Sequence, residues 1–144
     1  MLRDNTAEYE RRIGLIQDLR ERLGLDLLVA EGRTNDMPGT SRWLSLYQPD
    51  PSGSVATIVD ADGVTLVVLD PVQARFAKAL SWLENEPIVA LGRPLGEVIA
   101  ERAAKIGAKR VGLADGPALI ASAWVDAIRT AVPAAECSTT RGCR

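Results

Sequence analysis

The sequence Leu23-Gly24-Leu25-Asp26-Leu27-Leu28-Val29-Ala30 joins an amphipathic segment to a short apolar run, and this join decides the fold. Before it, apolar side chains recur at spacings of three and four residues from Tyr9 to Leu23, which predicts a helix with one apolar face. Gly24 suits the left-handed position just past a helix end. The run 26–30 then predicts a short buried strand, which is typical of an α/β protein. We expect Asn5 to cap the helix, with Glu8 reaching back to it.

Strand and helix patterns alternate through the rest of the chain. The segment from Glu31 to Gly53 is rich in turn-forming residues and is expected to be a long loop carrying one island, Arg42-Trp43-Leu44-Ser45-Leu46-Tyr47. The remaining predicted elements are a hairpin of strands 54–60 and 64–69, a helix from Pro71 capped by Asp70, a strand 87–91, a helix 94–106, a strand 110–113, a helix 117–131 and an edge strand 134–138. This order predicts a mixed sheet of five or six strands with helices on both faces.

The helix after Asp70 has an apolar pattern that predicts a buried face. The residues expected on that face are Val72, Phe76, Ala79, Leu80 and Leu83. Trp82 and Trp124 are also expected in helices, where large rings most often pack against the core. Trp43 differs because it lies in the loop beside Arg42 and near Tyr47, and loop aromatics and arginines are frequent in binding surfaces.

Composition excludes several classes of function. The chain has 144 residues, 17 Lys and Arg against 19 Asp and Glu, and a net charge of −2, so nucleic acid is not expected as a partner. No membrane span and no signal-peptide core are visible, which favours a cytoplasmic location. In that compartment Cys137 and Cys143 are expected to be free thiols.

The absence of histidine restricts the chemistry further. It removes the usual general base and the commonest transition-metal ligand, so an enzyme would have to use carboxylates or lysine. The loop acids Glu31, Asp36 and Asp50, with Arg33 and Arg42, share no predicted face and are expected to be solvated. Three further acids, Asp60, Asp62 and Asp115, are interpreted as turn and cap residues. We therefore expect no catalytic residue, metal site or cofactor in this chain.

Several phrases, taken in order, resemble a known family. The helix ending in Leu-Gly-Leu-Asp-Leu-Leu-Val, followed by a polar loop and the island 42–47, is similar to the N-terminal domain of creatinase, prolidase and Xaa-Pro aminopeptidases. The Asp62-Gly63 hairpin, Ile88-Val89-Ala90-Leu91-Gly92 and Ala108-Lys109-Arg110-Val111-Gly112-Leu113 fall in the same order. The resemblance covers residues 9–139. Within the island, Trp43 stands where the family usually has Tyr, and Ser45-Leu46 where it has Thr-Gly.

The resemblance implies a ribonuclease-H-like mixed sheet for residues 1–139, with residues 140–144 as a tail or linker stub. It also implies that chemistry belongs to a C-terminal "pita-bread" domain, which holds a pair of divalent metals and is absent from this chain. The expected role is an accessory one: shaping the active-site cleft and mediating contacts with the catalytic domain and with other subunits of a homo-oligomer. Arg42, Trp43 and Tyr47 are the residues expected to face the cleft or an interface.

Two other readings of the sequence stay open. One is a free-standing α/β domain that binds a ligand or another protein. The other is a small enzyme that uses carboxylates without histidine. Whether the chain is part of a longer enzyme or stands alone is not decided by its residues.

Overall fold

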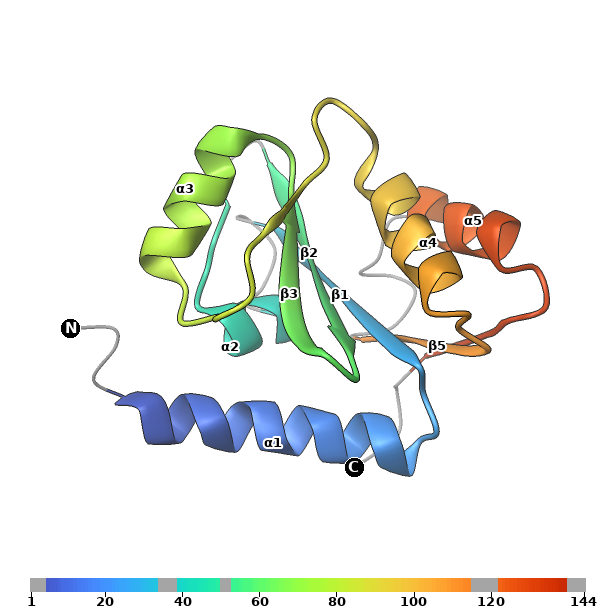
Figure 1. The fold of residues 1–144 in the computed structure, drawn as a ribbon, viewed down its shortest axis with the longest axis horizontal. Helices are drawn as coiled ribbons and strands as arrows, with labels where there is room; N and C mark the ends of the chain where they lie inside the picture. The colour runs from blue at the N-terminus through green and yellow to red at the C-terminus, as the bar shows by residue number, and fades with distance from the viewer. Residues whose placement is uncertain (1–4, 34–38, 50–52, 115–121, 140–144) are drawn as a thin grey trace.

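The computed structural model describes residues 5–33, 39–49, 53–114 and 122–139 (Figure 1). Its helices are α1 (Thr6–Arg22), α2 (Thr40–Ser45), α3 (Pro71–Leu80), α4 (Leu95–Lys105) and α5 (Ser122–Ala131). Its strands are β1 (Leu27–Arg33), β2 (Ser54–Asp60), β3 (Gly63–Val68), β4 (Ile88–Val89), β5 (Arg110–Leu113) and β6 (Glu136–Thr139).

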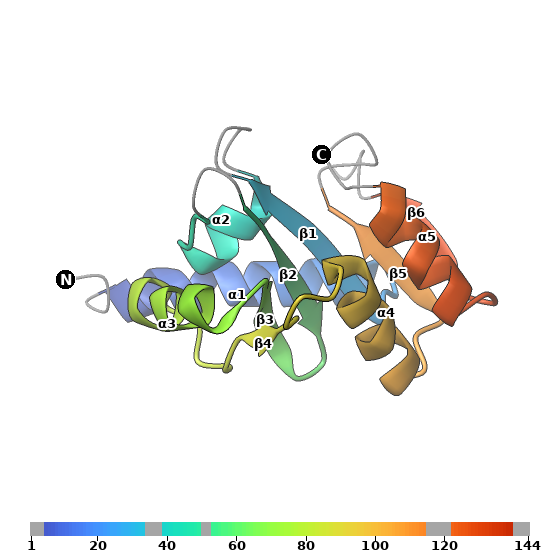
Figure 2. The same cartoon turned by 90° about the horizontal axis from the view of Figure 1, so that it is seen from above.

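The six strands form one mixed sheet in the order β4-β3-β2-β1-β5-β6 (Figure 2). β2 runs antiparallel to both β1 and β3, whereas β4, β5 and β6 are parallel to the strand beside each of them. β1 therefore lies inside the sheet, between the hairpin and the parallel half. The α/β class and the mixed sheet of five or six strands expected from the sequence are confirmed, and the structure has six.

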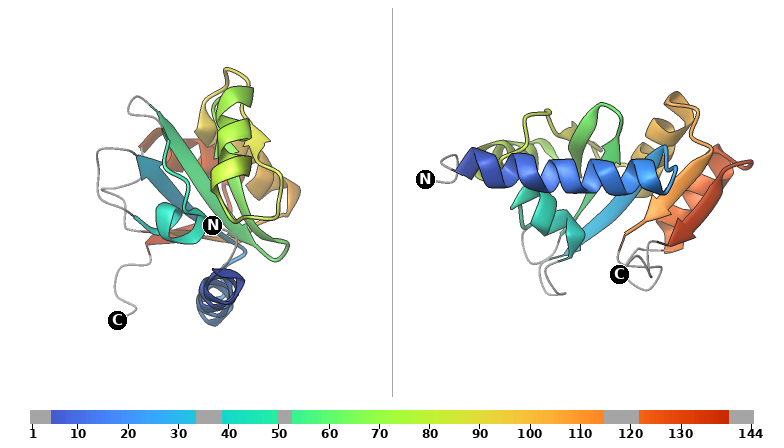
Figure 3. Two further views of the ribbon diagram at one scale, coloured as in Figure 1. Left: turned by 90° about the vertical axis from the view of Figure 1, so that its left-hand side faces the viewer. Right: turned by 90° about the horizontal axis from the view of Figure 1, so that it is seen from below.

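Helices cover both faces of the sheet, as the apolar pattern predicts. Along β1, Leu27 and Val29 join one core with side chains of α4 and α5, whereas Leu28 and Ala30 join another with Ile16 of α1. A third cluster, which includes Ala77 of α3, lies against Leu66 and Val68 of β3. Because successive strand residues point to opposite faces, α1, α2 and α3 share one face and α4 and α5 the other (Figure 3).

The join between α1 and β1 forms as the sequence predicts. Gly24 has φ 64°, and the amides of Gly24 and Leu25 donate to carbonyls of the last helical turn. Asp26 then accepts hydrogen bonds from the amides of Lys109 and Arg110 at 2.8 and 3.0 Å, and these bonds hold the pKa of its carboxyl below the ordinary value. The helix end is thus tied to the start of β5.

Three local predictions near the N-terminal half are wrong. The side chain of Asn5 makes no capping hydrogen bond, and Glu8 pairs with Arg11 and Arg12 instead of reaching back. β1 continues to Arg33, because residues 31–33 pair with β2. The island is a short helix, α2, rather than a loop.

The segment after Asp70 also differs from its prediction. Asp70 does cap α3, accepting a hydrogen bond from the Gln73 amide at 2.8 Å. The helix, however, ends at Leu80, which leaves Trp82 outside it. Four of the five residues predicted to be buried on its apolar face are exposed: Val72, Phe76, Ala79 and Leu80. Gln73 and Ala77 face the sheet in their place: Ala77 packs with Leu66 and Val68, and the Gln73 side chain accepts a hydrogen bond from the Leu69 amide.

In the C-terminal half, the predicted strand 87–91 pairs only at Ile88 and Val89, and Leu91 turns away with φ 50°. The helix 94–106 and the strand 110–113 are confirmed within a residue. Of the predicted helix 117–131, α5 accounts for residues 122–131, and residues 117–121 lie outside the described part. Trp124 is buried in the core between α4 and α5, as expected.

Asp60 at the end of β2 connects three parts of the fold. Its carboxylate accepts a hydrogen bond from the Asp62 amide at 2.9 Å, which confirms its predicted role in the turn. It also meets the Arg102 guanidinium of α4 at 2.6 Å, in a site where the Asp60 side chain is 6% exposed. On the other face of the sheet, Gln17 of α1 donates to the Asp60 carbonyl at 2.8 Å. The hairpin is thereby linked to helices on both faces.

We predict that Asp60→Ala lowers the free energy of unfolding by about 3 kcal/mol, because it leaves the Arg102 charge partly buried without its main partner and removes the turn hydrogen bond. Urea denaturation provides the measurement. Asp62→Asn is the matched control: its side chain is 80% exposed, so the loss there is expected to stay below about 0.5 kcal/mol. Equal losses in the two variants would contradict the assigned role of Asp60.

Candidate functional site

Hydroxyl groups buried beneath α2 hold this short helix on the sheet. The Ser41 and Thr57 hydroxyls are 2.6 Å apart, which joins α2 to β2. Ser45 donates to the Ser41 carbonyl and accepts from the Tyr47 amide. At Gly32 of β1, a Cβ would lie 2.9 Å from the Ser41 hydroxyl, so the absence of a side chain lets α2 approach the strand.

The helix ends at a residue in a conformation that favours glycine. Leu46 has φ 60° and ψ −4°, and its amide donates to the Arg42 carbonyl at 2.8 Å. This is the position at which the resembling family has Gly. Leu46 therefore holds a left-handed backbone conformation that glycine adopts at lower cost.

The three site residues predicted from the sequence have different environments. Arg42 is exposed, Trp43 is half-buried, and Tyr47 is buried at 4% exposure against the cluster beneath α3. Arg42 and part of Trp43 are thus accessible at the surface of this chain, whereas Tyr47 is almost fully covered. The interface role assigned to the island stays a prediction.

Sequence reasoning missed the residue that organises this region, which is Arg12 of α1. Its guanidinium lies between two indole rings, 5.2 Å from the centroid of Trp43 and 4.9 Å from that of Trp82. It also donates to the Trp43 carbonyl at 2.7 Å and to Glu8 at 2.8 Å. Because the two tryptophans lie far from Arg12 in the sequence, no local pattern identifies this contact.

Trp82 completes an aromatic cluster, which we define as Tyr9, Arg12, Trp43 and Trp82. Its indole N–H donates to the Leu44 carbonyl at 2.5 Å, and its ring centroid lies 5.3 Å from that of Tyr9. The cluster therefore links α1, α2 and the segment after α3. A cation between two indoles stabilises such a junction by about 1 kcal/mol for each ring face.

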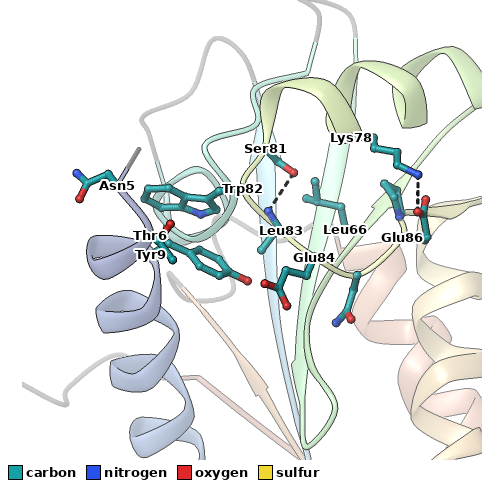
Figure 4. Close-up of a pocket in the computed structure, with 12 residues that line it drawn as sticks. Asn5, Thr6, Tyr9, Leu66, Lys78, Ser81, Trp82, Leu83, Glu84 and Glu86 are labelled. Atoms are coloured by element: carbon teal, nitrogen blue, oxygen red, sulfur yellow. Dashed lines mark hydrogen bonds and ion pairs between the residues drawn. The ribbon is translucent and has the colours of Figure 1, made fainter. Parts of the chain in front are cut away.

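A pocket of about 410 Å³ lies beside the aromatic cluster (Figure 4). The first turn of α1, Leu66 of β3, Lys78 of α3 and the segment 81–87 line it. Figure 4 shows Trp82 and Tyr9 at one end, with the Tyr9 hydroxyl toward Glu84, and the Lys78–Glu86 ion pair at the other. The pKa of Tyr9 is raised, first by burial and then by the negative charge of Glu84.

The loop acids do not form a catalytic cluster in the part of the chain that the structure describes. Glu31 was expected to be solvated, but its side chain is 3% exposed and pairs with Arg33 at 2.8 Å, because β1 extends through both residues. Asp36, Asp50 and Asp115 lie outside the described residues. Among those described, no group of three or more His, Cys, Asp or Glu is placed to hold a metal ion.

Two other predictions concern the chain ends and the membrane. Cys137 of β6 is half-buried with a free thiol, whereas Cys143 lies outside the described residues. None of the described helices is both long and apolar enough to span a bilayer.

We predict that Glu8 makes stability depend on pH through its bonds to Arg11 and Arg12. These bonds lower the pKa of Glu8 from 4.5 to about 2 in the folded state. The carboxylate therefore stabilises the fold above pH 4.5, and this contribution is lost as the pH falls toward 2. The melting-temperature difference between the native chain and Glu8→Gln should thus be largest near neutral pH and shrink on acidification. A difference that is constant over this range would contradict the assignment.

A double-mutant cycle tests the cation between the indoles. Arg12→Met and Trp43→Leu should show a coupling of about 1 kcal/mol in the free energy of unfolding, because Leu keeps the backbone carbonyl but removes the ring. Arg11→Met with Trp43→Leu is the control, since Arg11 binds the same Glu8 carboxylate but is 56% exposed. Coupling there should be near zero. Equal coupling in both cycles would show that Glu8, rather than the ring contact, carries the effect.

Among the comparisons with known proteins, the comparison with solved structures supports the fold. No family model and no curated protein matches this sequence. An Xaa-Pro aminopeptidase from Streptococcus pyogenes matches with a TM-score of 0.67 and 18% identity, over 94% of this chain and 93% of that one. An Xaa-Pro dipeptidase from Bacillus anthracis matches with a TM-score of 0.68 and 15% identity, over 93% of this chain but only 34% of that one.

Domains solved by themselves match as well. The N-terminal domain of the cytoplasmic peptidase PepQ from Mycobacterium tuberculosis has a TM-score of 0.62 and 19% identity, over 90% of this chain and 91% of that one. The present chain thus corresponds to nearly all of some solved chains and to about a third of others. The family resemblance seen in the sequence is matched at the level of structure: this chain has the fold of the N-terminal domain of Xaa-Pro peptidases.

Proposed function

We propose that this chain is an accessory domain of a metallohydrolase of the Xaa-Pro peptidase or creatinase type, and that it is not catalytic by itself. The observation that carries the proposal is the match with isolated N-terminal domains of such peptidases, which covers 90% of this chain. In a longer dipeptidase chain, the match covers only 34% of that chain. A domain that forms a third of such a chain is suited to shape substrate access rather than to supply the chemistry.

The surface of α2 is the part of this domain that we assign to the cleft or to a subunit contact. Arg42 is exposed, and Trp43 keeps part of its ring at the surface. Tyr47, which is buried with Leu66, Val68 and Ala77, fixes the chain just past the helix. The aromatic cluster and the buried hydroxyls hold this surface in one conformation, which lowers the entropy lost on docking.

The partners in this proposal are a C-terminal catalytic domain of the same protein and further copies in a homo-oligomer. The divalent metal pair belongs to that catalytic domain, so no cofactor is assigned to this chain. The acidic balance of charge argues against nucleic acid as a partner. We place the protein in the cytoplasm, away from membranes, as its sequence predicts.

We predict that the purified chain neither binds Mn²⁺, Co²⁺ or Zn²⁺ tightly nor cleaves Xaa-Pro dipeptides, because it has no histidine and its described carboxylates do not gather into a metal site. Isothermal calorimetry with each metal and a dipeptide hydrolysis assay provide the measurements. A stoichiometric metal site of micromolar affinity, or turnover by the chain alone, would overturn the proposal.

The gene sequence that follows the codon for Arg144 separates this proposal from its alternatives. A downstream frame that encodes a further domain with histidine and clustered Asp and Glu is the expected result. A stop codon at that point would favour the alternative of a free-standing α/β domain that binds a ligand or a protein. The pocket beside the aromatic cluster is the observation that keeps this alternative open.

A further inference from the structure

The pocket beside the aromatic cluster has a charge pattern that selects one kind of ligand. At one end, Lys78 and Glu86 neutralise each other in an ion pair of 2.5 Å. At the other end, the Glu84 carboxylate is exposed and makes no hydrogen bond or ion pair with the described residues. Burial raises the pKa of the Tyr9 hydroxyl most, and the negative charge of Glu84 raises it further, against a hydrogen bond with the Glu84 backbone that lowers it. The pocket thus keeps one negative charge without a partner.

The other positive charges near the pocket share one carboxylate. Arg12, on the Trp82 ring, and Arg11 both bind Glu8. The first turn of α1, which borders the pocket, carries the partial positive charge of a helix N-terminus, and Glu8 lies in that turn. Among the charged residues that line the pocket, Lys78 and Glu86 pair with each other, so the Glu84 carboxylate is the group that favours a cation over an anion.

The floor of the pocket is apolar. Leu66, which is 1% exposed, and Leu83, which is half-buried, both line it, and Figure 4 shows Leu66 between the Glu84 end and the Lys78–Glu86 end. The ring of Tyr9, packed against Trp82, forms the wall at the Glu84 end. A volume of about 410 Å³ accommodates a small molecule with a short hydrocarbon body.

We propose that this pocket binds a small organic cation, namely a primary ammonium group on a short apolar chain. The ammonium group binds the Glu84 carboxylate beside the Tyr9 ring, and the hydrocarbon lies over Leu66 and Leu83. The Lys78–Glu86 pair closes the far end. This site lies apart from the α2 surface and does not depend on the proposed peptidase role, so either proposal can fail without the other.

Three probes of equal length test the proposal: n-pentylammonium, n-pentanol and pentanoate. Each is titrated into the isotopically labelled chain while the backbone amides of residues 81–87 and the indole N–H of Trp82 are followed by NMR. We expect pentylammonium to bind with a millimolar Kd, as suits so small a ligand. Pentanol should bind at least about threefold more weakly, and pentanoate more weakly still. Pentanoate binding as tightly as pentylammonium, or shifts confined to other residues, would overturn the proposal.

Glu84→Gln identifies the group that recognises the charge. The exposed side chain keeps its shape, so folding should be unaffected, while the affinity for pentylammonium should fall about threefold or more, to that of pentanol. Pentanol binding should not change. Asp126→Asn is the matched control, because it removes one exposed negative charge from α5, on the other face of the sheet. Equal effects of the two substitutions would show that net charge, rather than this pocket, attracts the cation.

Discussion

Burial of both faces of β1 is the constraint on which the rest of the structure depends. Leu27, Leu28, Val29 and Ala30 are each at most 2% exposed, so every side chain at this point of the sheet needs a covering layer. At roughly 25 cal/mol for each Å² of apolar surface, neither face can be left to solvent without a large loss of stability. Side chains of α1 and α2 cover one face of β1, and side chains of α4 and α5 cover the other. Asp60, which bonds α4 through its carboxylate and α1 through its carbonyl, then sets where the hairpin ends relative to both layers.

The Arg12 guanidinium held between aromatic rings is the second interaction that organises the structure. Arg12 contacts Trp43 and Trp82 and is itself neutralised by Glu8, so a charged side chain from α1 takes the place of an apolar one in the junction. This arrangement positions α2, the surface that we assign to a cleft or subunit contact. It also positions Trp82 and Tyr9 at the edge of the pocket. The two candidate sites therefore share one structural support but differ in what they present: an exposed arginine beside a half-buried tryptophan in one case, and a pocket with the Glu84 carboxylate in the other.

The exposed apolar stripe on α3 remains without an assigned role. Val72, Phe76 and Leu80 are each more than 40% exposed, at 61%, 56% and 47%. Their spacing of four residues predicts a buried face, and the described part of the chain does not cover it. Exposed apolar stripes of this kind are typical of surfaces that contact a partner. It does not by itself identify the partner.

The sequence by itself determined the element order, the join at Gly24, the Asp62-Gly63 hairpin, the Asp70 cap and the two-sided burial of β1. These features depend on local backbone preferences and on the spacing of apolar residues, and both can be identified within a short stretch of sequence. Tertiary structure alone decided that Glu31 is buried, that α3 turns Gln73 and Ala77 rather than Phe76 to the sheet, and that Arg12 lies between two indoles. Those outcomes depend on which elements pack against each other. Contacts such as that of Arg12 with Trp82 join residues far apart in the chain, so no local sequence pattern predicts them.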